Sequence, residues 1–462
     1  MKKELLSSAI FDSRVPEEKI TGKEKILGFF MGPIAVMVMN AILSNYLNVY
    51  YTDVLKIGAI WGGAFIALFP IVAKVLDVIT FIYMGLVVDR TRSRQGKARP
   101  WILFAAPLMF VCMILLFVVP KGNDNLTAIW IFASYTVFYA VAYTMYSTAH
   151  TLMVPLATRS EAERRSLSTI ANTPGMAAGS LVAILFPCVI VPLLGVSESR
   201  WVTAAIVIAV FSFPLMLLEF FFTRERVSTP TAEQEQKASL AAQLRCCAKS
   251  RSWVALMAYL IVLNLVNQLF STATFYYCNW VLGSYNDGFT QALFYALGQA
   301  PLGVGVLLCG PICKKFGKRN TLLGGAMLAV VGVVICLLNP KSLVLVLAGQ
   351  FIRSIGLIPT TFMVSSMLGD ALDDVERVSG ARCDGFSSSV FNCIITISGG
   401  IALCVFNFGL SFFGYQAPTA EWIPVQGPAV QNFLIFCVIG VQLIAYPLLG
   451  ILTRFFPKDQ KA

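Results

Sequence analysis

The sequence predicts an all-α polytopic membrane protein, and composition and the length of the apolar stretches support this fold class. Hydrophobic residues make up 57% of the 462 residues and charged residues only 13%, whereas soluble globular proteins carry about 25% charged residues. The mean hydropathy is +0.75. The apolar stretches are much longer than the ~10-residue alternating strands of an outer-membrane barrel. The same composition excludes a disordered chain.

Twelve segments are long and apolar enough to cross a membrane. A spanning helix needs ~20 mostly apolar residues, because the hydrocarbon core is ~30 Å thick and each helical residue rises ~1.5 Å. Residues 1–24 are polar, so we expect no cleaved signal peptide. The predicted spans are 27–52, 60–88, 101–119, 126–154, 168–195, 201–222, 253–282, 289–313, 320–338, 342–369, 384–413 and 430–456.

The distribution of Lys and Arg predicts the orientation. With the N-terminus in the cytoplasm, 29 of the 35 basic residues fall in cytoplasmic loops and tails, and 4 fall in outer loops. This bias follows the positive-inside rule and places both termini in the cytoplasm of a cell-membrane protein. The net charge of +11 is therefore explained by topology, and we expect the lipid bilayer, not nucleic acid, as the macromolecular environment.

The chain divides into two halves of six predicted spans. The polar segment 224–252, with a helix-compatible patch at 238–247, separates them, and Gly85-Leu-Val-Val-Asp-Arg recurs in altered form 225 residues later at Gly310. Two parallel six-helix repeats are the arrangement of major-facilitator transporters. The predicted parts are a tail 1–26, a half 27–223, the linker 224–252, a half 253–456 and a tail 457–462.

The most specific motif surrounds the end of the second span. It reads Asp77-Val-Ile-Thr-Phe-Ile-Tyr-Met-Gly-Leu-Val-Val-Asp89-Arg-Thr-Arg-Ser-Arg-Gln-Gly96-Lys-Ala-Arg-Pro100-Trp101. Tyr50-Tyr-Thr-Asp53 closes the first span, and Gly380-Ala-Arg382-Cys-Asp384 opens the eleventh after an acidic loop at 369–376. In these segments the chain resembles the glycoside–pentoside–hexuronide:cation symporter family, the melibiose permease group of the major facilitator superfamily.

The resemblance implies a cation site on the second and fourth spans. The family places two carboxylates one helical turn apart, an Asn between them and a Thr on the fourth span; here these positions hold Asp77, Phe81, Thr80 and Thr144. Only one carboxylate is present, and Lys74 stands three residues before it. An intramembrane acid is functional by default, so we expect Asp77 to couple H⁺ or Na⁺. The alternative is a structural ion pair with Lys74.

The family's sugar site is changed more strongly. Its Tyr on the fourth span is kept as Tyr143, but its Asp, its helix-5 Arg and its helix-11 Lys fall on Ser147, Asn172 and Asn392. The charged clamp for sugar hydroxyls is therefore absent, which leaves the substrate open.

Polar and aromatic stripes at helical spacing are candidates to replace that clamp. The residues predicted to line a substrate site are Tyr139, Tyr143, Tyr146 and His150 on the fourth span, Asn40, Ser44 and Asn48 on the first, and Asn264, Asn267 or Gln268, and Ser271 on the seventh. Each stripe is equally consistent with hydrogen bonds between helices.

Three further ionisable residues lie in or near predicted spans. His150, the only histidine, titrates near physiological pH in its unperturbed form; otherwise it is a hydrogen-bonded structural residue. Arg353 can hold a substrate carboxylate, or it caps carbonyl groups or pairs with an acid. Glu219, near the end of the sixth span, is expected to extend its carboxylate to the interface.

The basic loop motifs predict a cytoplasmic gate. Asp89, Arg90 and Arg92 follow the second span, and Arg382 opens the eleventh. We expect these residues to contact neighbouring helices in one state of an alternating-access cycle. Solvated charges that set topology are the alternative.

These observations predict a monomeric secondary transporter that carries a small sugar or glycoside together with H⁺ or Na⁺. A carrier of an apolar or amphipathic solute, steroid- or lipid-like, and a non-transporting sensor remain alternatives. We expect no enzyme activity, since the sequence has no nucleophile–base pair or phosphate loop. No cofactor or metal centre is expected apart from the coupling ion.

Overall fold

A computed structural model describes residues 9–91, 93–158, 160–227, 240–283, 285, 287–379, 384–419 and 421–456. All of the regular elements in these residues are helical. The chain forms two compact units. The first comprises residues 1–186, 193–236 and 417–421, and the second comprises residues 187–192, 237–416 and 422–462.

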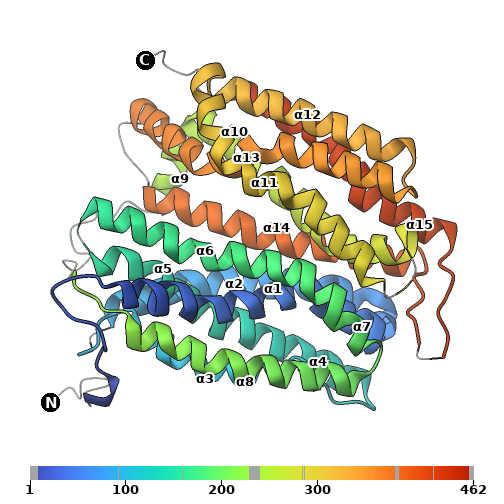
Figure 1. Cartoon of the computed structure of the whole chain (residues 1–462), viewed down its shortest axis with the longest axis horizontal. Helices are drawn as coiled ribbons and strands as arrows, with labels where there is room; N and C mark the ends of the chain where they lie inside the picture. Colours follow the sequence, from blue (N-terminus) through green and yellow to red (C-terminus); the bar gives the residue numbers. More distant parts are fainter. Residues whose placement is uncertain are drawn as a thin grey trace. The chain divides into compact units, whose positions relative to one another are not determined.

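The N-terminal unit is built on α1, which packs against α6 and α8, while α3 lies along α8 (Figure 1). The fourth predicted span is continuous but contains a π-helical turn, η5, between α4 and α5. The elements are η2 (Glu24–Met31), α1 (Gly32–Val49), α2 (Ala64–Arg90), α3 (Arg99–Leu115), α4 (Asp124–Thr136), η5 (Val137–Tyr143), α5 (Thr144–Ala157), α6 (Glu161–Leu185) and α8 (Glu198–Phe222).

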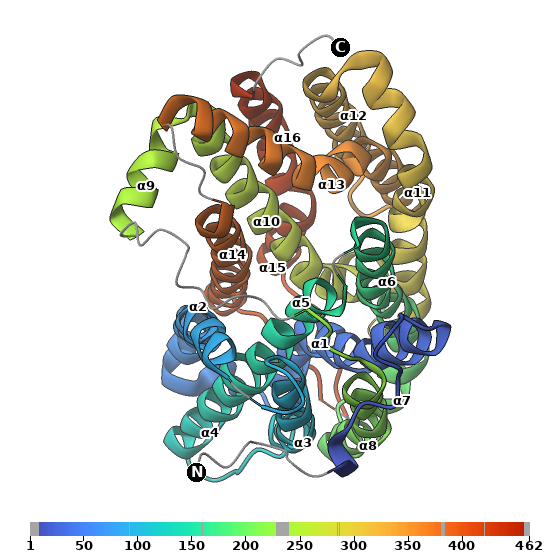
Figure 2. The ribbon, with the colours of Figure 1, turned by 90° about the vertical axis from the view of Figure 1, so that its left-hand side faces the viewer.

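In the C-terminal unit, α13 packs against α10, α11 and α12, and α14 lies beside α10 (Figure 2). The elements are α9 (Leu240–Lys249), α10 (Arg251–Tyr277), α11 (Gly288–Phe316), α12 (Lys318–Leu338), α13 (Leu343–Ser379), α14 (Asp384–Phe412), α15 (Pro428–Ile435), η8 (Phe436–Gly440) and α16 (Val441–Leu452). The helix-compatible patch expected near 238–247 is confirmed as α9.

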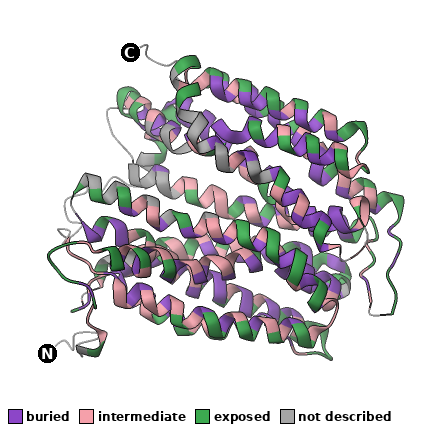
Figure 3. Ribbon diagram, viewed as in Figure 1, coloured by how far each residue is buried: buried purple, intermediate pink, exposed green. Residues whose placement is uncertain are grey.

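Ten helices in the described residues are long and apolar enough to cross a membrane. They coincide with ten of the predicted spans, and the other two predicted spans, 101–119 and 289–313, fall on α3 and α11. Buried and exposed residues alternate along single helices (Figure 3), and exposed positions include large apolar side chains such as Phe211, Leu338 and Val344. Apolar outer faces of this kind are compatible with lipid.

Glycines allow close helix contacts in both units. In the N-terminal unit, a β-carbon at Gly32 would lie 2.6 Å from Cβ of Glu219 on α8. In the C-terminal unit, a β-carbon at Gly332 of α12 would lie 2.5 Å from the backbone nitrogen of Arg353 on α13. Small residues that let backbones approach are typical of membrane helix interfaces, so these contacts fix where Glu219 and Arg353 lie.

The sequence-based expectation of an acidic loop at 369–376 is wrong. Helix α13 runs without a break for 37 residues to Ser379 and includes this segment. The charged residues continue the helix because its end packs against other helices of the unit, including the start of α10 through Asp374 and Ser250. Apolarity marks only the part of a helix that lipid can surround, so it underestimates helices that extend beyond it.

Candidate functional site: buried charges in both units

The first buried charge lies on α2 in the N-terminal unit. Lys74 Nζ is 2.8 Å from Asp77 Oδ2, and the side chain of Asp77 is only 4% exposed. Residues three apart lie on one helical face, which makes this contact possible. The other carboxylate oxygen, Asp77 Oδ1, is buried without a hydrogen-bond partner. The ion pair expected as the alternative for Asp77 is present, yet it uses only half of the carboxylate.

Aromatic rings surround the ammonium group of Lys74. Its Nζ lies 4.1 Å from the ring centroid of Tyr139 and 5.7 Å from that of Tyr135. Ser44 of α1 lies near the hydroxyl of Tyr139, whose ring centroid is 6.1 Å from that of Tyr143. Three predicted substrate residues, Ser44, Tyr139 and Tyr143, therefore meet near Lys74. Asn40, one turn before Ser44, is partly buried.

The two threonines of the predicted cation site bond to their own helices. Thr80 donates to the carbonyl oxygens of Leu76 and Asp77, each at 3.0 Å. Thr144 donates to the carbonyl oxygen of Tyr139 at 2.9 Å, where the π-helical turn ends. Thr80 and Thr144 thus hydrogen-bond within their own spans, and their role as cation ligands stays a prediction.

The stripe from Tyr139 to His150 meets two different partners. Tyr139 and Tyr143 lie near Lys74, whereas Tyr146 and His150 contact Glu219 of α8. Tyr139 and His150 are about 16 Å apart along the helix axis, so the two ends of the stripe reach different partners. Tyr146 and His150 stack with ring centroids 5.6 Å apart.

Glu219 is a buried site residue that sequence reasoning missed. Its side chain is 0% exposed, His150 Nδ1 lies 2.6 Å from Oε1, and the Tyr146 hydroxyl donates to Oε2. The expectation that this carboxylate extends to the interface is wrong, because two donors on α5 hold it inside the unit. The unexplained polarity of Tyr146 and His150 was the only signal in the sequence.

Two family-implied substrate positions lie farther along the same unit. The Ser147 hydroxyl is buried and has no hydrogen-bond partner in the described part of the chain. Asn172 lies on α6, but its side chain is outside the described residues. The substrate roles of both residues stay predictions.

The C-terminal unit has a buried charge of its own. Arg353 of α13 is 3% exposed and lines a cavity of about 380 Å³ together with Asn264, Asn267 and Ser271 of α10. The Nδ2 of Asn264 donates to the carbonyl oxygen of Leu260 at 2.8 Å. The stripe on the seventh span is therefore brought together with Arg353, as residues 264, 267 and 271 share one face of α10.

Gln268 and Asn392 do not line this cavity. Gln268 lies on another face of α10, where its Nε2 would be 2.9 Å from a β-carbon at Gly399 of α14. One residue in an α-helix rotates the side chain by ~100°, which separates Gln268 from Asn267. Asn392 is exposed on α14. The sequence did not decide between Asn267 and Gln268 as the lining residue, and in the structure Asn267 lines the cavity.

The predicted gate is only partly visible. Arg90 is exposed at the end of α2, the side chain of Asp89 is outside the described residues, and so are Arg92 and Arg382. The loop that follows is held by Glu225, whose carboxylate accepts hydrogen bonds from the backbone N–H groups of residues 97, 98 and 99 at 2.8–3.0 Å. A carboxylate at a helix N-terminus is stabilising there, so Glu225 anchors the start of α3.

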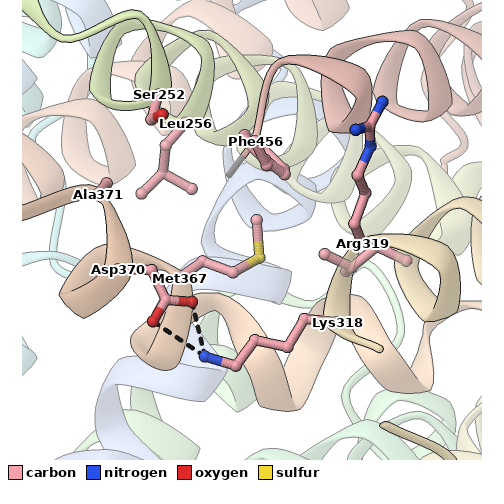
Figure 4. A pocket seen from close by; sticks show the side chains of 9 residues that line it. Ser252, Leu256, Lys318, Arg319, Met367, Asp370, Ala371 and Phe456 are labelled. Atoms are coloured by element: carbon pink, nitrogen blue, oxygen red, sulfur yellow. Dashed lines mark hydrogen bonds and ion pairs between the residues drawn. The ribbon is translucent and has the colours of Figure 1, made fainter. Parts of the chain in front are cut away.

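The corresponding loop of the C-terminal unit has its own ion pair. Lys318, the first residue of α12, donates to both carboxylate oxygens of Asp370 at 2.6 and 2.9 Å. Figure 4 shows this pair at a small pocket that Met367 and Phe456 also line. In both units the repeated motif thus leads into a helix whose start is held by a carboxylate from a distant segment. Glu225 holds the start of α3, and Asp370 holds the start of α12.

A chain of long apolar helices with charges buried inside its units is a multi-pass membrane protein of the transporter class. The family model described as MFS/sugar transport protein matches residues 28–460. The chain therefore belongs to this family, whose members are membrane transporters of small solutes and not enzymes.

Curated relatives cover nearly the whole chain at low identity. The chain is 26% identical to the isoprimeverose transporter of Lactiplantibacillus pentosus, over 88% of this chain and 84% of that one. It is 28% identical to the putative glycoside/cation symporter YagG of Escherichia coli, over 92% and 90%. The glucuronide carrier protein homolog of the same species is 27% identical, over 94% and 93%.

Solved structures share the fold. A bacterial homolog of the human lysosomal transporter Spinster aligns with a TM-score of 0.63 and 14% identity, covering 93% of this chain and 98% of that one. The peptide transporter POT aligns with a TM-score of 0.60 and 11% identity, over 96% and 100%. At these identities the likeness concerns the fold alone.

Proposed function

We propose that this protein carries a small sugar or glycoside across the cell membrane together with a cation, H⁺ or Na⁺, by alternating access. Relatives that are named as isoprimeverose, glycoside and glucuronide carriers support the solute class. The proposed carrier is a monomer with twelve spans in two six-helix halves, 27–223 and 253–456, and with both termini in the cytoplasm. The proposed gate comprises Asp89, Arg90, Arg92 and Arg382.

The observation that carries cation coupling is the state of Asp77. Its carboxylate is buried in an apolar span, Lys74 satisfies one oxygen, and Oδ1 has no hydrogen-bond partner in the described residues. A buried carboxylate with a free oxygen gains from binding a cation there. We favour H⁺ over Na⁺, because Na⁺ needs several oxygen ligands and negative charge, whereas Phe81 stands where the family has a second acid.

The test is uptake into proteoliposomes that contain the purified full-length protein. Solute counterflow with a panel of glycosides, uronides and steroids identifies a transported solute first. Uptake of that solute is then measured under a pH gradient, under a Na⁺ gradient and with neither. We expect the pH gradient to drive accumulation in the unmodified protein, and Asp77→Asn to abolish accumulation while counterflow persists, since exchange of solute needs no net proton movement.

Asp124→Asn is the matched control, because it removes an exposed carboxylate in the first turn of α4. It should leave gradient-driven uptake unchanged. Normal pH-driven accumulation in Asp77→Asn would remove Asp77 from coupling. Counterflow of a steroid but of no sugar would favour the carrier of amphipathic solutes, and no counterflow across the panel would favour the sensor.

A further inference from the structure

The Arg353 guanidinium has few of the partners that a buried cation normally has. Its Nη1 donates to the Tyr446 hydroxyl at 3.2 Å, and its carbon Cζ lies 4.4 Å from the ring centroid of Phe270. Its Nε is buried without any hydrogen-bond partner. A planar guanidinium is built to bind an anion through two parallel N–H groups, and here at least one of its donors is unused.

The surroundings of Arg353 provide no balancing charge. In the described part of the chain, no carboxylate oxygen lies within 4.0 Å of the guanidinium, and the cavity lining contains no Asp or Glu. The alternative that Arg353 pairs with an acid therefore finds no support in these residues. A cation–π contact returns much less than burial of an ion costs, so Phe270 and Tyr446 alone do not compensate the charge.

The backbone that carries Arg353 is packed closely against α12. A β-carbon at Gly332 of α12 would lie 2.5 Å from the Arg353 nitrogen, so the two helices are in direct contact there. Arg353 cannot leave the cavity by a shift of α13 without separating this contact. With Tyr446 and Phe270 in contact with the guanidinium, this cation beside the cavity is a partly preorganised site for a ligand.

The cavity has the size and chemistry of a small-solute site. Its volume of about 380 Å³ lies in the range of ~300–1,000 Å³ that is typical of ligand pockets. Asn264, Asn267 and Ser271 supply amide and hydroxyl groups, and Thr361 adds another hydroxyl. The remaining lining is mostly apolar, which suits the C–H face of a polyhydroxylated carbon skeleton.

We propose that this cavity is an anion site within the C-terminal unit, in which Arg353 binds the carboxylate or sulfonate of a small polyhydroxylated monoanion. The anion balances the buried charge and accepts from Nε, the donor that Tyr446 leaves unused. Tyr446 positions the guanidinium through Nη1, and the polar groups of α10 bind the hydroxyls of the solute. The inference deepens the proposed transport function and rests on it for the statement that this anion is transported.

The experiment compares two anions with a neutral sugar, and one of the anions has the same ring as that sugar. Binding of methyl β-D-glucuronide, methyl β-D-glucoside and 2,3-dihydroxypropane-1-sulfonate is measured by calorimetry and by the shift in thermal unfolding of the purified protein, and counterflow is measured in parallel. We expect the unmodified protein to bind at least one of the two anions about tenfold or more tightly than the neutral glucoside, which corresponds to one charged contact.

Variants assign this preference to Arg353. Arg353→Gln should lower anion affinity at least tenfold and leave the affinity for the glucoside within about twofold, and Arg353→Lys should fall between, since it keeps the charge but loses the fork. Tyr446→Phe should weaken anion binding less than Arg353→Gln. Lys341→Gln is the matched control, because it removes an exposed cation of the same unit and should change neither affinity.

Several results would overturn the inference. They are equal affinity of the unmodified protein for the anions and the glucoside, absence of anion binding, and equal loss of both ligands in Arg353→Gln and Arg353→Lys. Anion binding that depends on Arg353 without counterflow of any solute would leave the anion site standing and reject the transport function. Counterflow of the glucoside without any preference for anions would support the transport function and reject the anion site.

Discussion

His150 Nδ1 lies 2.6 Å from Glu219 Oε1, and this contact joins α5 to α8 inside the N-terminal unit. Glu219 also accepts a hydrogen bond from Tyr146, so both of its oxygens have donors although its side chain is inaccessible to solvent. A buried ion that has lost its partner is strongly destabilising. The stability of the protein therefore depends on Tyr146, His150 and Glu219 together, because each loses a partner when another is removed.

Removal of the Glu219 carboxylate should destabilise the protein more than any surface substitution. Glu219→Ala leaves the Tyr146 hydroxyl and the His150 ring without an acceptor and should cost about 3–5 kcal/mol, while Glu219→Gln keeps an acceptor and should cost less. Thermal unfolding of the purified protein in detergent measures both. Glu18→Ala, at an exposed position, is the control, and equal melting temperatures for Glu219→Ala and this control would refute the role of the pair.

The sequence pointed to two of the three residues of this site, Tyr146 and His150, but not to Glu219. The spacing places Tyr146 and His150 on one face, to line a substrate site or to bond between helices, and both residues contact Glu219 of α8. The partner is 69 residues away from His150, on a helix whose contact with its neighbours depends on the packing at Gly32. Hydropathy places Glu219 near the end of a span, where a free side chain would reach water; tertiary packing decides otherwise, and a single sequence does not contain that information.

The ion pair of Lys74 and Asp77 should show strong energetic coupling. Asp77→Asn leaves a mostly buried ammonium without its counterion, and Lys74→Met leaves a buried carboxylate without one, so each should lower stability by about 3–5 kcal/mol. The double variant removes both charges and should be more stable than the sum of the single losses predicts. A double-mutant cycle of unfolding free energies measures the difference.

Additive losses in that cycle would contradict a direct pair. The rings beside Lys74 provide a second check, because Tyr139→Leu removes the face that lies 4.1 Å from Nζ. This variant should weaken the coupling between Lys74 and Asp77 only slightly, since a cation–π contact is worth about 0.5–2 kcal/mol. If Tyr139→Leu lowered the free energy of unfolding as much as Asp77→Asn does, Tyr139 and not Asp77 would be the main partner of Lys74.

The fold was more predictable than the site, for a physical reason. Membrane helices need long apolar runs, and ten predicted spans have a corresponding helix that is long and apolar enough. Side-chain partners depend on phase and contact instead. One position decides that Asn267 lines the cavity and Gln268 does not. That one-residue choice has no signature in the sequence.

Two adjacent glycines on α12 give a sharp test of helix packing. A β-carbon at Gly325 would lie 3.2 Å from Cγ of Pro359 and closer still to the carbonyl oxygen of Gly356, both on α13. A β-carbon at Gly324 would have no neighbour within 4 Å. Gly325→Ala should therefore cost about 1–3 kcal/mol through overpacking, whereas Gly324→Ala should be neutral or stabilise by up to ~1 kcal/mol.

Melting temperatures of the two variants decide between packing and propensity. If α12 and α13 were not in contact at Gly325, both substitutions would raise helix propensity and both would be neutral or stabilising. A lower melting temperature for Gly325→Ala alone is the expected result. A loss in Gly324→Ala as large as in Gly325→Ala would contradict the described orientation of α12.

Asp374 links the end of α13 to the start of α10, outside the spans. Its Oδ2 accepts a hydrogen bond from Ser250 Oγ at 2.7 Å, and Ser250 is the N-cap residue of α10. Partial burial acts to raise the pKa of Asp374, but hydrogen bonds from Ser250, Ser252 and Arg377 outweigh it and lower that pKa below the ordinary carboxyl value. The folded state therefore favours the charged carboxylate.

This shift predicts the pH dependence of one variant. A carboxyl group whose pKa is lower in the folded than in the unfolded state contributes its stabilisation above the unfolded pKa of ~3.9 and loses it as the pH falls through the folded value. Asp374→Asn should therefore lower the melting temperature at pH 7, with a loss of about 1–3 kcal/mol for hydrogen bonds to a charged group. The difference from the unmodified protein should shrink as the pH falls below 4. Glu18→Gln should show no such difference at any pH, and a gap for Asp374→Asn that widens toward acid would mean that this carboxyl group is stabilised in its protonated form.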